Sequence, residues 1–245
     1  MFSVKNLLVN MQNYFVIRLV TLGFMSVKQN KTFVRLGSDY GGWWIPKDVL
    51  DDKSKNRLMI SAGLGFDVTF DQALLDSGFE VIGLDPLKDS INFANHALRI
   101  YPKFISINMG LWTKTGIEKF FPPKNRTHDS WSATNIQNAA TTDFEEFNVI
   151  SIDDLFSRFP QIEQADFCAM KMDIEGSEIQ LIPALVNFRT RFDLLAIEMD
   201  FLSLIPFLSL WTRICMICHA RKMLKSLKQR NYQLVMNENF NFIWI

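Results

Sequence analysis

The sequence is poor in cysteine, with only Cys168, Cys215 and Cys218 among 245 residues. A chain of this length with so few thiols has no disulfide framework, and we expect Cys215 and Cys218 to be buried structural thiols. A secretory signal is not evident either. Residues 11–27 are fairly apolar, but Arg18 interrupts them and no convincing cleavage site of small residues follows. These features favour a cytoplasmic protein.

The chain also lacks an excess of either charge. Lys plus Arg and Asp plus Glu both number 26, so the formal net charge is zero, and the bulk composition predicts no nucleic-acid partner. Long apolar runs are missing too, because Pro206 and Arg213 divide residues 201–217 below the length that crosses a bilayer. We therefore expect no transmembrane span. Weak peripheral membrane contact through residues 11–27 or 201–217 stays open, and the oligomeric state is not predicted.

Glycine is sparse, but two of its 11 occurrences, Gly63 and Gly65, stand in a turn between two apolar runs. The second run, residues 81–84, leads directly to Asp85. In parallel sheets such a turn lets the backbone approach a ligand without a Cβ in the way. An acid about 20 positions later accepts hydrogen bonds from ribose hydroxyls. Residues 58–86 therefore predict a site for an adenosine-containing ligand.

A third glycine is missing from this turn, which reads Gly63-Leu64-Gly65-Phe66-Asp67. Dinucleotide sites use that glycine for close helix–strand packing around a pyrophosphate. A carboxylate such as Asp67 would repel a diphosphate, whereas it is tolerable near the ammonium group of an amino-acid ligand. A nicotinamide-dependent oxidoreductase is therefore the weaker alternative.

Strand-like and helix-like segments alternate from Leu58 onward, which predicts an α/β fold with a parallel sheet covered by helices. The predicted strands include residues 58–60, 80–84, 104–107, 117–121, 167–172 and 194–199, and the later predicted helices include residues 177–186 and 220–229. Two final strands, in which Phe240, Phe242 and Trp244 alternate with other residues, form a terminal hairpin. Five parallel strands with such a hairpin resemble the Rossmann-like, seven-stranded class I sheet of S-adenosylmethionine-dependent methyltransferases.

Two regions fall outside this alternation. Residues 1–45 are expected to form an N-terminal helical extension, and residues 46–245 the main domain. At their junction lies Tyr40-Gly41-Gly42-Trp43-Trp44-Ile45-Pro46, in which we expect Tyr40 to cover a ligand and Trp44 to pack against the sheet. The polar segment after Phe121 is long for a compact domain, and such loops are usually functional.

Several acids follow the predicted strand 167–172. Asp173, Glu175 and Glu178 should emerge at the same sheet edge as Gly63 and Asp85. One acid there can hold a ligand's ammonium group, and another can accept a proton from a substrate hydroxyl. The alternative is that Glu175 and Glu178 only favour the positive end of the next helix. We prefer the functional interpretation because two edges converge on one place. Glu198 and Asp200, after the next strand, extend this acidic rim.

The segment Lys171-Met172-Asp173-Ile174-Glu175-Gly176-Ser177-Glu178 resembles the Lys-x-Asp-x-Glu-Gly-x-Glu motif of the FkbM-type methyltransferases. The family signature also has a glycine turn after the first strand and an acid that ends the second. The resemblance covers about residues 37–245. It implies a Rossmann-like fold, S-adenosylmethionine as methyl donor, and hydroxyl acceptors on sugars, glycolipids or polyketide-like products.

Carried over position by position, the resemblance implies that Gly63 and Gly65 line the cofactor and that Asp85 binds the ribose. The full predicted cofactor-binding set is Ser61, Gly63, Gly65, Asp67, Asp85, Pro86 and Asn108. The predicted catalytic residues are Glu175, Asp173 and His128. His128 is included because histidine titrates near neutrality, with an exposed loop histidine of no function as the equal alternative. A metal site is not predicted, because the acids lack a diagnostic spacing.

The sequence thus predicts an S-adenosylmethionine-dependent methyltransferase that acts on a hydroxyl of a sugar, glycolipid or other small acceptor. A nucleic-acid acceptor is disfavoured, because the strand ending at Met172 leads into Asp-Ile-Glu rather than an aromatic Asn-Pro-Pro-type motif for a flipped base. The alternative from another class is a non-catalytic module that binds the adenosyl ligand. Ser61 stands where an acid commonly opens the turn, and Asp67 replaces a later glycine of the family pattern.

Overall fold

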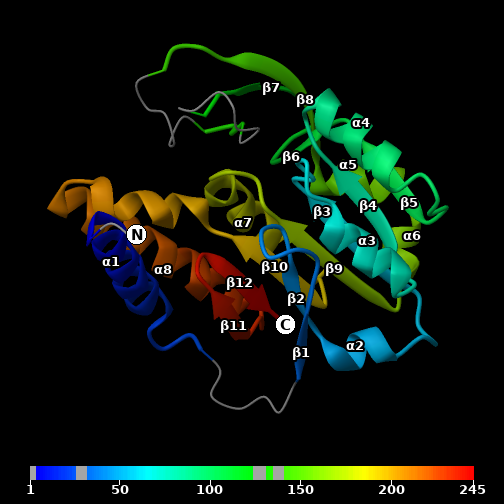
Figure 1. The fold of residues 1–245 in the computed structure, drawn as a ribbon, viewed down its shortest axis with the longest axis horizontal. Helices are drawn as coiled ribbons and strands as arrows, with labels where there is room; N and C mark the ends of the chain where they lie inside the picture. Colours follow the sequence, from blue (N-terminus) through cyan, green and yellow to red (C-terminus); the bar gives the residue numbers. More distant parts are fainter. Residues whose placement is uncertain (1–3, 26–31, 124–130, 135–140) are drawn as a thin grey trace.

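The computed structural model describes residues 4–25, 32–123, 131–134 and 141–245 (Figure 1). Its first elements are α1 (Val4–Thr21), β1 (Phe33–Leu36), β2 (Trp43–Pro46), α2 (Lys47–Asp51), β3 (Arg57–Ala62), α3 (Thr69–Asp76), β4 (Glu80–Leu84), α4 (Lys88–Ala97) and β5 (Phe104–Ile107). The middle of the chain forms β6 (Gly110–Trp112), β7 (Gly116–Phe120), β8 (Glu145–Ser151), α5 (Ile152–Arg158), α6 (Gln161–Gln164) and β9 (Phe167–Met172). The last elements are α7 (Glu178–Asn187), β10 (Leu194–Glu198), the 3-10 helix η2 (Asp200–Phe207), α8 (Leu210–Gln229), β11 (Leu234–Glu238) and β12 (Asn241–Trp244).

Seven strands form the main sheet in the order β11-β12-β10-β9-β3-β4-β5. The five strands from β10 to β5 are parallel, whereas β12 runs antiparallel to β10 and β11 antiparallel to β12. This confirms the predicted parallel sheet with a terminal antiparallel pair. β3 lies at the centre, where Ser61 pairs with Gly83 of β4 and Lys171 of β9. The order reverses beside β3, which opens a crevice at the carboxyl ends of β3 and β9.

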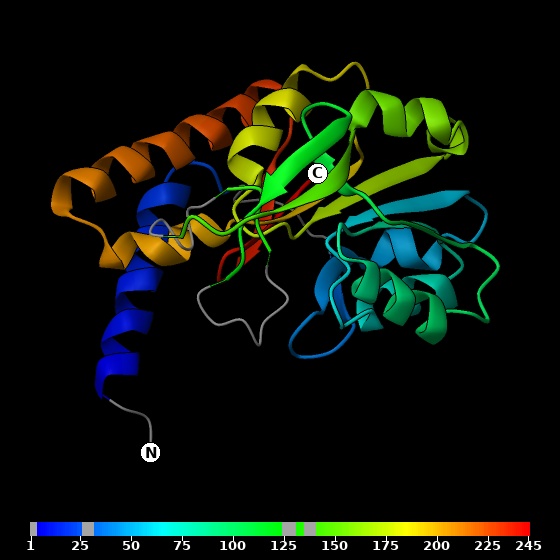
Figure 2. The ribbon, with the colours of Figure 1, turned by 90° about the horizontal axis from the view of Figure 1, so that it is seen from above.

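Helices cover both faces of this sheet (Figure 2). One apolar core joins the strands to α5, α7 and α8, with Phe156, Leu181 and Leu224 among its buried side chains. The other joins them to α3, α4 and the β1–β2 hairpin, with Phe70 and Ala94 buried there. Alternate residues of β3 face the two cores, since Ile60 belongs to the first and Met59 to the second. A strand buried on both faces needs a continuous apolar run, and this run is why β3 could be predicted from the sequence.

A second, three-stranded sheet, β6-β8-β7, stands beside the carboxyl edge of the main sheet (Figure 1). β7 confirms the strand predicted at residues 117–121, but β6 and β8 were not predicted. The N-terminal residues also differ from the expected helical extension. α1 is helical, whereas β1 and β2 pair as an antiparallel hairpin in which Leu36 lies opposite Trp43. The division into residues 1–45 and 46–245 stays a prediction.

The prediction that Cys215 and Cys218 are buried structural thiols was wrong. Cys168 is buried in β9, but Cys215 and Cys218 are exposed. Both lie in the first half of α8, which begins at Leu210 rather than near residue 220 as predicted. The buried residues of α8 lie further along, from Ala220 to Leu227, so the early turns have little contact with the core. Within the described residues, no helix combines the length and apolarity needed to cross a bilayer.

Candidate active site

A cavity of about 260 Å³ lies at the carboxyl ends of β3, β4, β9 and β10. Seven of the predicted site residues line it, namely Gly63, Gly65, Asp67, Asp85, Pro86, Asp173 and Glu175. Its wall also includes Gly110 of β6 and Phe120 of β7, neither of which was predicted. The fold therefore brings the glycine turn and the acidic segment, which are far apart in the sequence, to the same cavity.

Two of the predicted residues that the structure describes are not part of this wall. Ser61 is fully buried within β3, and Asn108 lies beside the cavity. The Asn108 side-chain amide donates to the carbonyl oxygens of Asp85 at 3.1 Å and Pro86 at 2.8 Å, so it braces the chain after β4. His128 lies outside the described residues.

Gly63 joins the turn to both neighbouring strands. Its N–H donates to the Leu84 carbonyl at 2.9 Å, and its own carbonyl accepts a 2.5 Å hydrogen bond from the Lys171 ammonium. Gly63 has a φ of +82°, and a Cβ at this position would lie 1.8 Å from the carbonyl oxygen of Asp173. Glycine is required here both by the left-handed backbone and by this close approach.

Asp85 holds the same turn from the other side. One carboxylate oxygen accepts from the N–H groups of Leu64 at 3.1 Å and Gly65 at 3.0 Å, and the other accepts from Leu87 at 2.8 Å. Burial raises the pKa of Asp85, whereas these backbone donors act against the shift. Asp85 is thus a buried acceptor group fixed at the turn that lines the cavity, and its binding of a ribose stays a prediction.

Asp67 has a structural function in addition to its place on the cavity wall. One of its oxygens accepts from the Ser38 hydroxyl at 2.5 Å, and the other accepts from the Thr69 N–H at 3.0 Å. Burial by itself raises the pKa of Asp67, but these hydrogen bonds outweigh it and leave the pKa below its ordinary value. The Asp67 carboxylate is therefore charged at neutral pH, and it ties the β1–β2 hairpin to the start of α3.

The β1–β2 hairpin contributes aromatic side chains to this region. Tyr40 lines the cavity and is 87% exposed, as expected of a residue that covers a ligand. Trp44 is half-buried, and its ring N–H donates to Glu238 at 2.9 Å. Trp43 is buried in the core and also reaches the cavity wall, so the packing function falls more on Trp43 than on Trp44.

Lys171 is a buried cation at the end of β9. Its ammonium group lies 3.2 Å from a carboxylate oxygen of Asp173. Burial by itself lowers the pKa of Lys171, but the Asp173 and Asp71 carboxylates outweigh it and the pKa is raised. The ammonium therefore stays charged and holds both the Gly63 carbonyl and Asp173 in place.

The turn after Asp173 has an unusual backbone. Glu175 adopts a φ of +57°, a region that side-chain-bearing residues rarely occupy, and Gly176 follows at +92°. Glu178, at the start of α7, accepts hydrogen bonds from the Ile174 and Gly176 N–H groups, both at 3.3 Å. Glu178 thus stabilises the turn, and the strain at Glu175 lies where the side chain faces the cavity.

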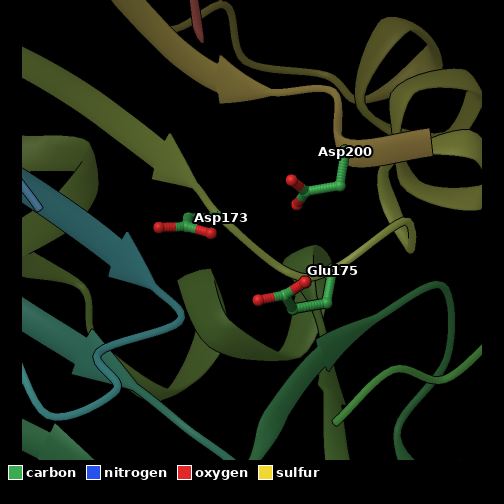
Figure 3. A group of neighbouring side chains, drawn as sticks. All are labelled: Asp173, Glu175 and Asp200. Carbon is green, nitrogen blue, oxygen red and sulfur yellow. The ribbon is translucent and has the colours of Figure 1, made fainter. Parts of the chain in front are cut away.

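The carboxylates of Asp173, Glu175 and Asp200 point toward one another (Figure 3). One carboxylate oxygen from each of the three lies within 4.8 Å of the other two. Asp200 comes from the start of η2. Burial first, and then neighbouring carboxylates, raises the pKa of Asp200 and of the adjacent Glu198 well above their ordinary values. The sequence placed Glu198 and Asp200 on the rim of the site but not within it. The sequence feature that indicated these two acids is their position at the end of a buried strand, β10, and just after it.

This cluster of acids can do two things chemically. A carboxylate on the cavity wall can accept a proton from a hydroxyl group. Three carboxylates at this separation also form the all-oxygen ligand set that Mg²⁺ or Mn²⁺ accepts in proteins. Lys171 supplies a neighbouring positive charge but is already paired with Asp173.

Comparison with solved structures gives low overall similarity. The fibrillarin pre-rRNA processing protein of Methanococcus jannaschii has 10% sequence identity and a TM-score of 0.42, with 92% of this chain and 91% of that chain covered. The N-terminal domain of human METTL16 in complex with SAH has 11% identity and a TM-score of 0.41, with 99% and 84% covered. A human methyltransferase 10 domain containing protein has 10% identity and a TM-score of 0.39, with 96% and 97% covered.

Comparison with curated protein sequences gives no significant match. The family comparison is different, because the model described as "Methyltransferase FkbM domain" matches residues 60–234, from the centre of β3 to the beginning of β11. That range contains the glycine turn, Asp85 and the complete acidic segment. The match confirms the resemblance drawn from the Lys171–Glu178 motif. The chain belongs to the FkbM methyltransferase domain family.

Proposed function

We propose that this protein is an S-adenosylmethionine-dependent O-methyltransferase whose acceptor is a hydroxyl group on a sugar, a glycolipid or another small molecule. The observation that carries the proposal is the shared cavity. On one wall it has the Gly63–Asp67 turn and Asp85, and on another it has the carboxylates of Asp173, Glu175 and Asp200. A site for an adenosyl ligand and a group of proton acceptors thus face the same space.

The residues of the first wall fit the adenosyl group. Gly63 and Gly65 present backbone without side chains, and a Cβ at Gly63 would collide with Asp173. The buried Asp85 carboxylate is held by three backbone donors, so it is oriented before a ligand arrives. A carboxylate so fixed can accept a ribose hydroxyl at its remaining acceptor position without reorganising. We assign Gly63, Gly65, Asp85 and Pro86 to this ligand.

S-adenosylmethionine supplies an activated methyl group on its sulfonium. The protein then has to align the acceptor and take up the hydroxyl proton. We assign the proton acceptor to Glu175, whose half-buried side chain lies on the cavity wall with the neighbouring acids. Asp173 is engaged by Lys171, so we assign it to orienting the acceptor. His128 stays a prediction for the same step.

Calorimetry with S-adenosylmethionine, S-adenosylhomocysteine and NAD tests the cofactor, and transfer from labelled S-adenosylmethionine to a fractionated small-molecule extract tests the acceptor. We expect binding of the first two ligands only, and label in a saccharide or small-molecule fraction whose methyl group is stable to mild base. Binding without transfer to any fraction would favour the non-catalytic module. Binding of NAD alone would overturn the proposal.

A further inference from the structure

Outside the cavity, the largest unexplained feature is the outer face of α1. Its inner face packs against the rest of the protein through the buried residues Val16, Ile17 and Val20. Its outer face is apolar as well, although a helix at a protein surface is usually polar there. Phe15 is 64% exposed and Leu22 is 69% exposed. The exposed residues Met11, Phe15 and Arg18 follow a spacing of four and three, which places them on one side of the helix, and Leu22 is exposed in the turn directly after it.

The beginning of α8 has the same character. Leu210 and Trp211 are each 75% exposed, and Ile214 is 47% exposed. Further along the same helix, the exposed residues include the basic side chains Lys222, Lys225 and Lys228. One helix face therefore passes from apolar to basic.

α1 and α8 are fixed to one another. The Arg221 guanidinium of α8 donates to the carbonyl oxygens of Leu19 at 2.7 Å, Val20 at 3.2 Å and Leu22 at 3.1 Å. The Leu19 and Val20 carbonyls belong to the last turn of α1, where carbonyl groups lack helical partners, and Leu22 follows directly after the helix. In both Figure 1 and Figure 2, α1 and the beginning of α8 lie at the same end of the molecule, opposite α4 and α6.

The charged residues of α1 and α8 are all basic. α1 and α8 together carry seven Lys and Arg residues and no Asp or Glu. In the sequence, Asp39 is the first acidic residue, and no acid occurs between Asp200 and Glu238. Since the whole chain is neutral, the rest carries an equal excess of acidic charge. Where the two helices meet, Arg221, Lys225 and Lys228 line a hollow together with Leu22 and Phe24.

We propose that the apolar–basic surface, formed by Met11, Tyr14, Phe15, Arg18 and Leu22 of this N-terminal region and by Leu210, Trp211, Ile214, Lys222 and Lys225 of α8, docks on an anionic lipid bilayer. Exposed aliphatic and aromatic side chains flanked by Lys and Arg suit the boundary between headgroups and acyl chains. A second copy of the chain is a poorer occupant, because a twofold contact would place two basic surfaces face to face. The proposal does not depend on methyl transfer.

The bilayer surface would lie next to the acidic end of the cavity. η2 begins at Asp200, which lines the cavity, and ends at Phe207, just before α8 starts at Leu210. α1 packs along η2 as well as along α8. Docking through α1 and α8 would therefore bring the acceptor side of the cavity close to the headgroups.

Co-sedimentation of the full chain with vesicles tests this surface. We expect binding to phosphatidylcholine vesicles that contain phosphatidylserine, weaker binding at high salt, and little binding to pure phosphatidylcholine. Phe15→Ser combined with Trp211→Ser should weaken binding at least about tenfold, and Lys222→Gln with Lys225→Gln about tenfold or more. Ile100→Ser and Lys88→Gln are matched controls, because both side chains are exposed at the opposite end, and they should leave binding unchanged.

All the altered side chains are exposed, so the variants should keep the wild-type circular dichroism and thermal unfolding, which are measured first. The proposal is overturned if the protein does not sediment with either vesicle type, or sediments with both equally. It is also overturned if the Phe15 and Trp211 double variant binds as the wild type does. Light scattering that reveals a dimer, lost in that double variant, would assign the surface to a second copy instead.

Discussion

The backbone of Gly63 lies against the backbone of Asp173 so closely that a single added carbon would stand 1.8 Å from the Asp173 carbonyl oxygen. This contact joins the turn after β3 to the turn after β9. It is supported by the Lys171 ammonium, which binds the Gly63 carbonyl and the Asp173 carboxylate at once. The two halves of the site are therefore positioned by one small set of contacts, and a change in one half should be felt in the other.

Gly63→Ala should destabilise the protein by at least about 3 kcal/mol, because it combines a left-handed backbone with a clash against backbone atoms. Gly23→Ala is the matched control. Gly23 has a φ of +83°, but a Cβ there meets nothing within 4 Å, so we expect a cost of about 1 kcal/mol from the backbone alone. Urea unfolding measures both values. Equal costs for the two variants would show that the contact with Asp173 does not matter.

Asp85→Asn should weaken S-adenosylmethionine binding more than about tenfold, because it removes a charged acceptor from the ribose site and disturbs the glycine turn. Asp89→Asn, an exposed acid at the start of α4, should leave the dissociation constant unchanged. Titration calorimetry compares the two variants. If both variants bind like the wild type, Asp85 is not part of the cofactor site.

Glu175→Gln should lower kcat by about 100-fold or more while leaving S-adenosylmethionine affinity within about twofold of the wild type. Glutamine has the shape of glutamate and meets the same backbone strain, so the turn should be kept. Glu146→Gln, an exposed change in β8, is the control and should have no effect on kcat. Full turnover by Glu175→Gln would exclude Glu175 as the proton acceptor and direct attention to Asp173 or His128.

The crowded acids should make stability depend on pH in a defined direction. Because the folded-state pKa values of Glu198 and Asp200 are raised by burial and like charge, the folded protein binds more protons than the unfolded chain does. Their contribution to stability is therefore complete below an unfolded pKa of about 4, and it is lost as pH rises through the folded values. We expect the free energy of unfolding, measured in EDTA, to fall from about pH 4 toward neutral pH.

Asp200→Asn should reduce that fall and should raise the melting temperature at neutral pH, because the neutral amide needs no proton on folding, whereas the buried Asp200 carboxyl with its raised pKa does. At about pH 4 the variant and the wild type should differ little. Thermal unfolding over the pH series gives the comparison. A wild-type stability that rises between about pH 4 and pH 7 would contradict the arrangement of acids described above.

Much of the fold could be predicted from sequence because its central strands are buried on both faces. β4 and β9 have the bounds that their apolar runs indicated, as does β5 at the edge of the sheet. Prediction failed where a strand is short or partly exposed. β6 has only three residues, and β8 begins with the exposed residues Glu145 and Glu146, so neither has a strong pattern. The early turns of α8 look like a core segment in sequence, yet they project from the body with Cys215 and Cys218 exposed.

The site divides in the same way. Gly63, Asp85, Asp173 and Glu175 could be predicted because each follows a strand whose carboxyl end the topology fixes. Asp200 could be placed only near the site, because its approach to Glu175 depends on the course of η2. The structural function of Asp67 could not be predicted at all. It depends on Ser38, which the β1–β2 hairpin brings from 29 residues away.

Calorimetric titration of the purified chain with S-adenosylmethionine, repeated with NAD and with the Asp85→Asn variant, tests the central claim most directly. The account predicts one site per chain for S-adenosylmethionine, weakened more than about tenfold by the variant, and no heat from NAD. Binding of NAD in the same cavity would contradict it. An S-adenosylmethionine dissociation constant that Asp85→Asn leaves unchanged would contradict it as well.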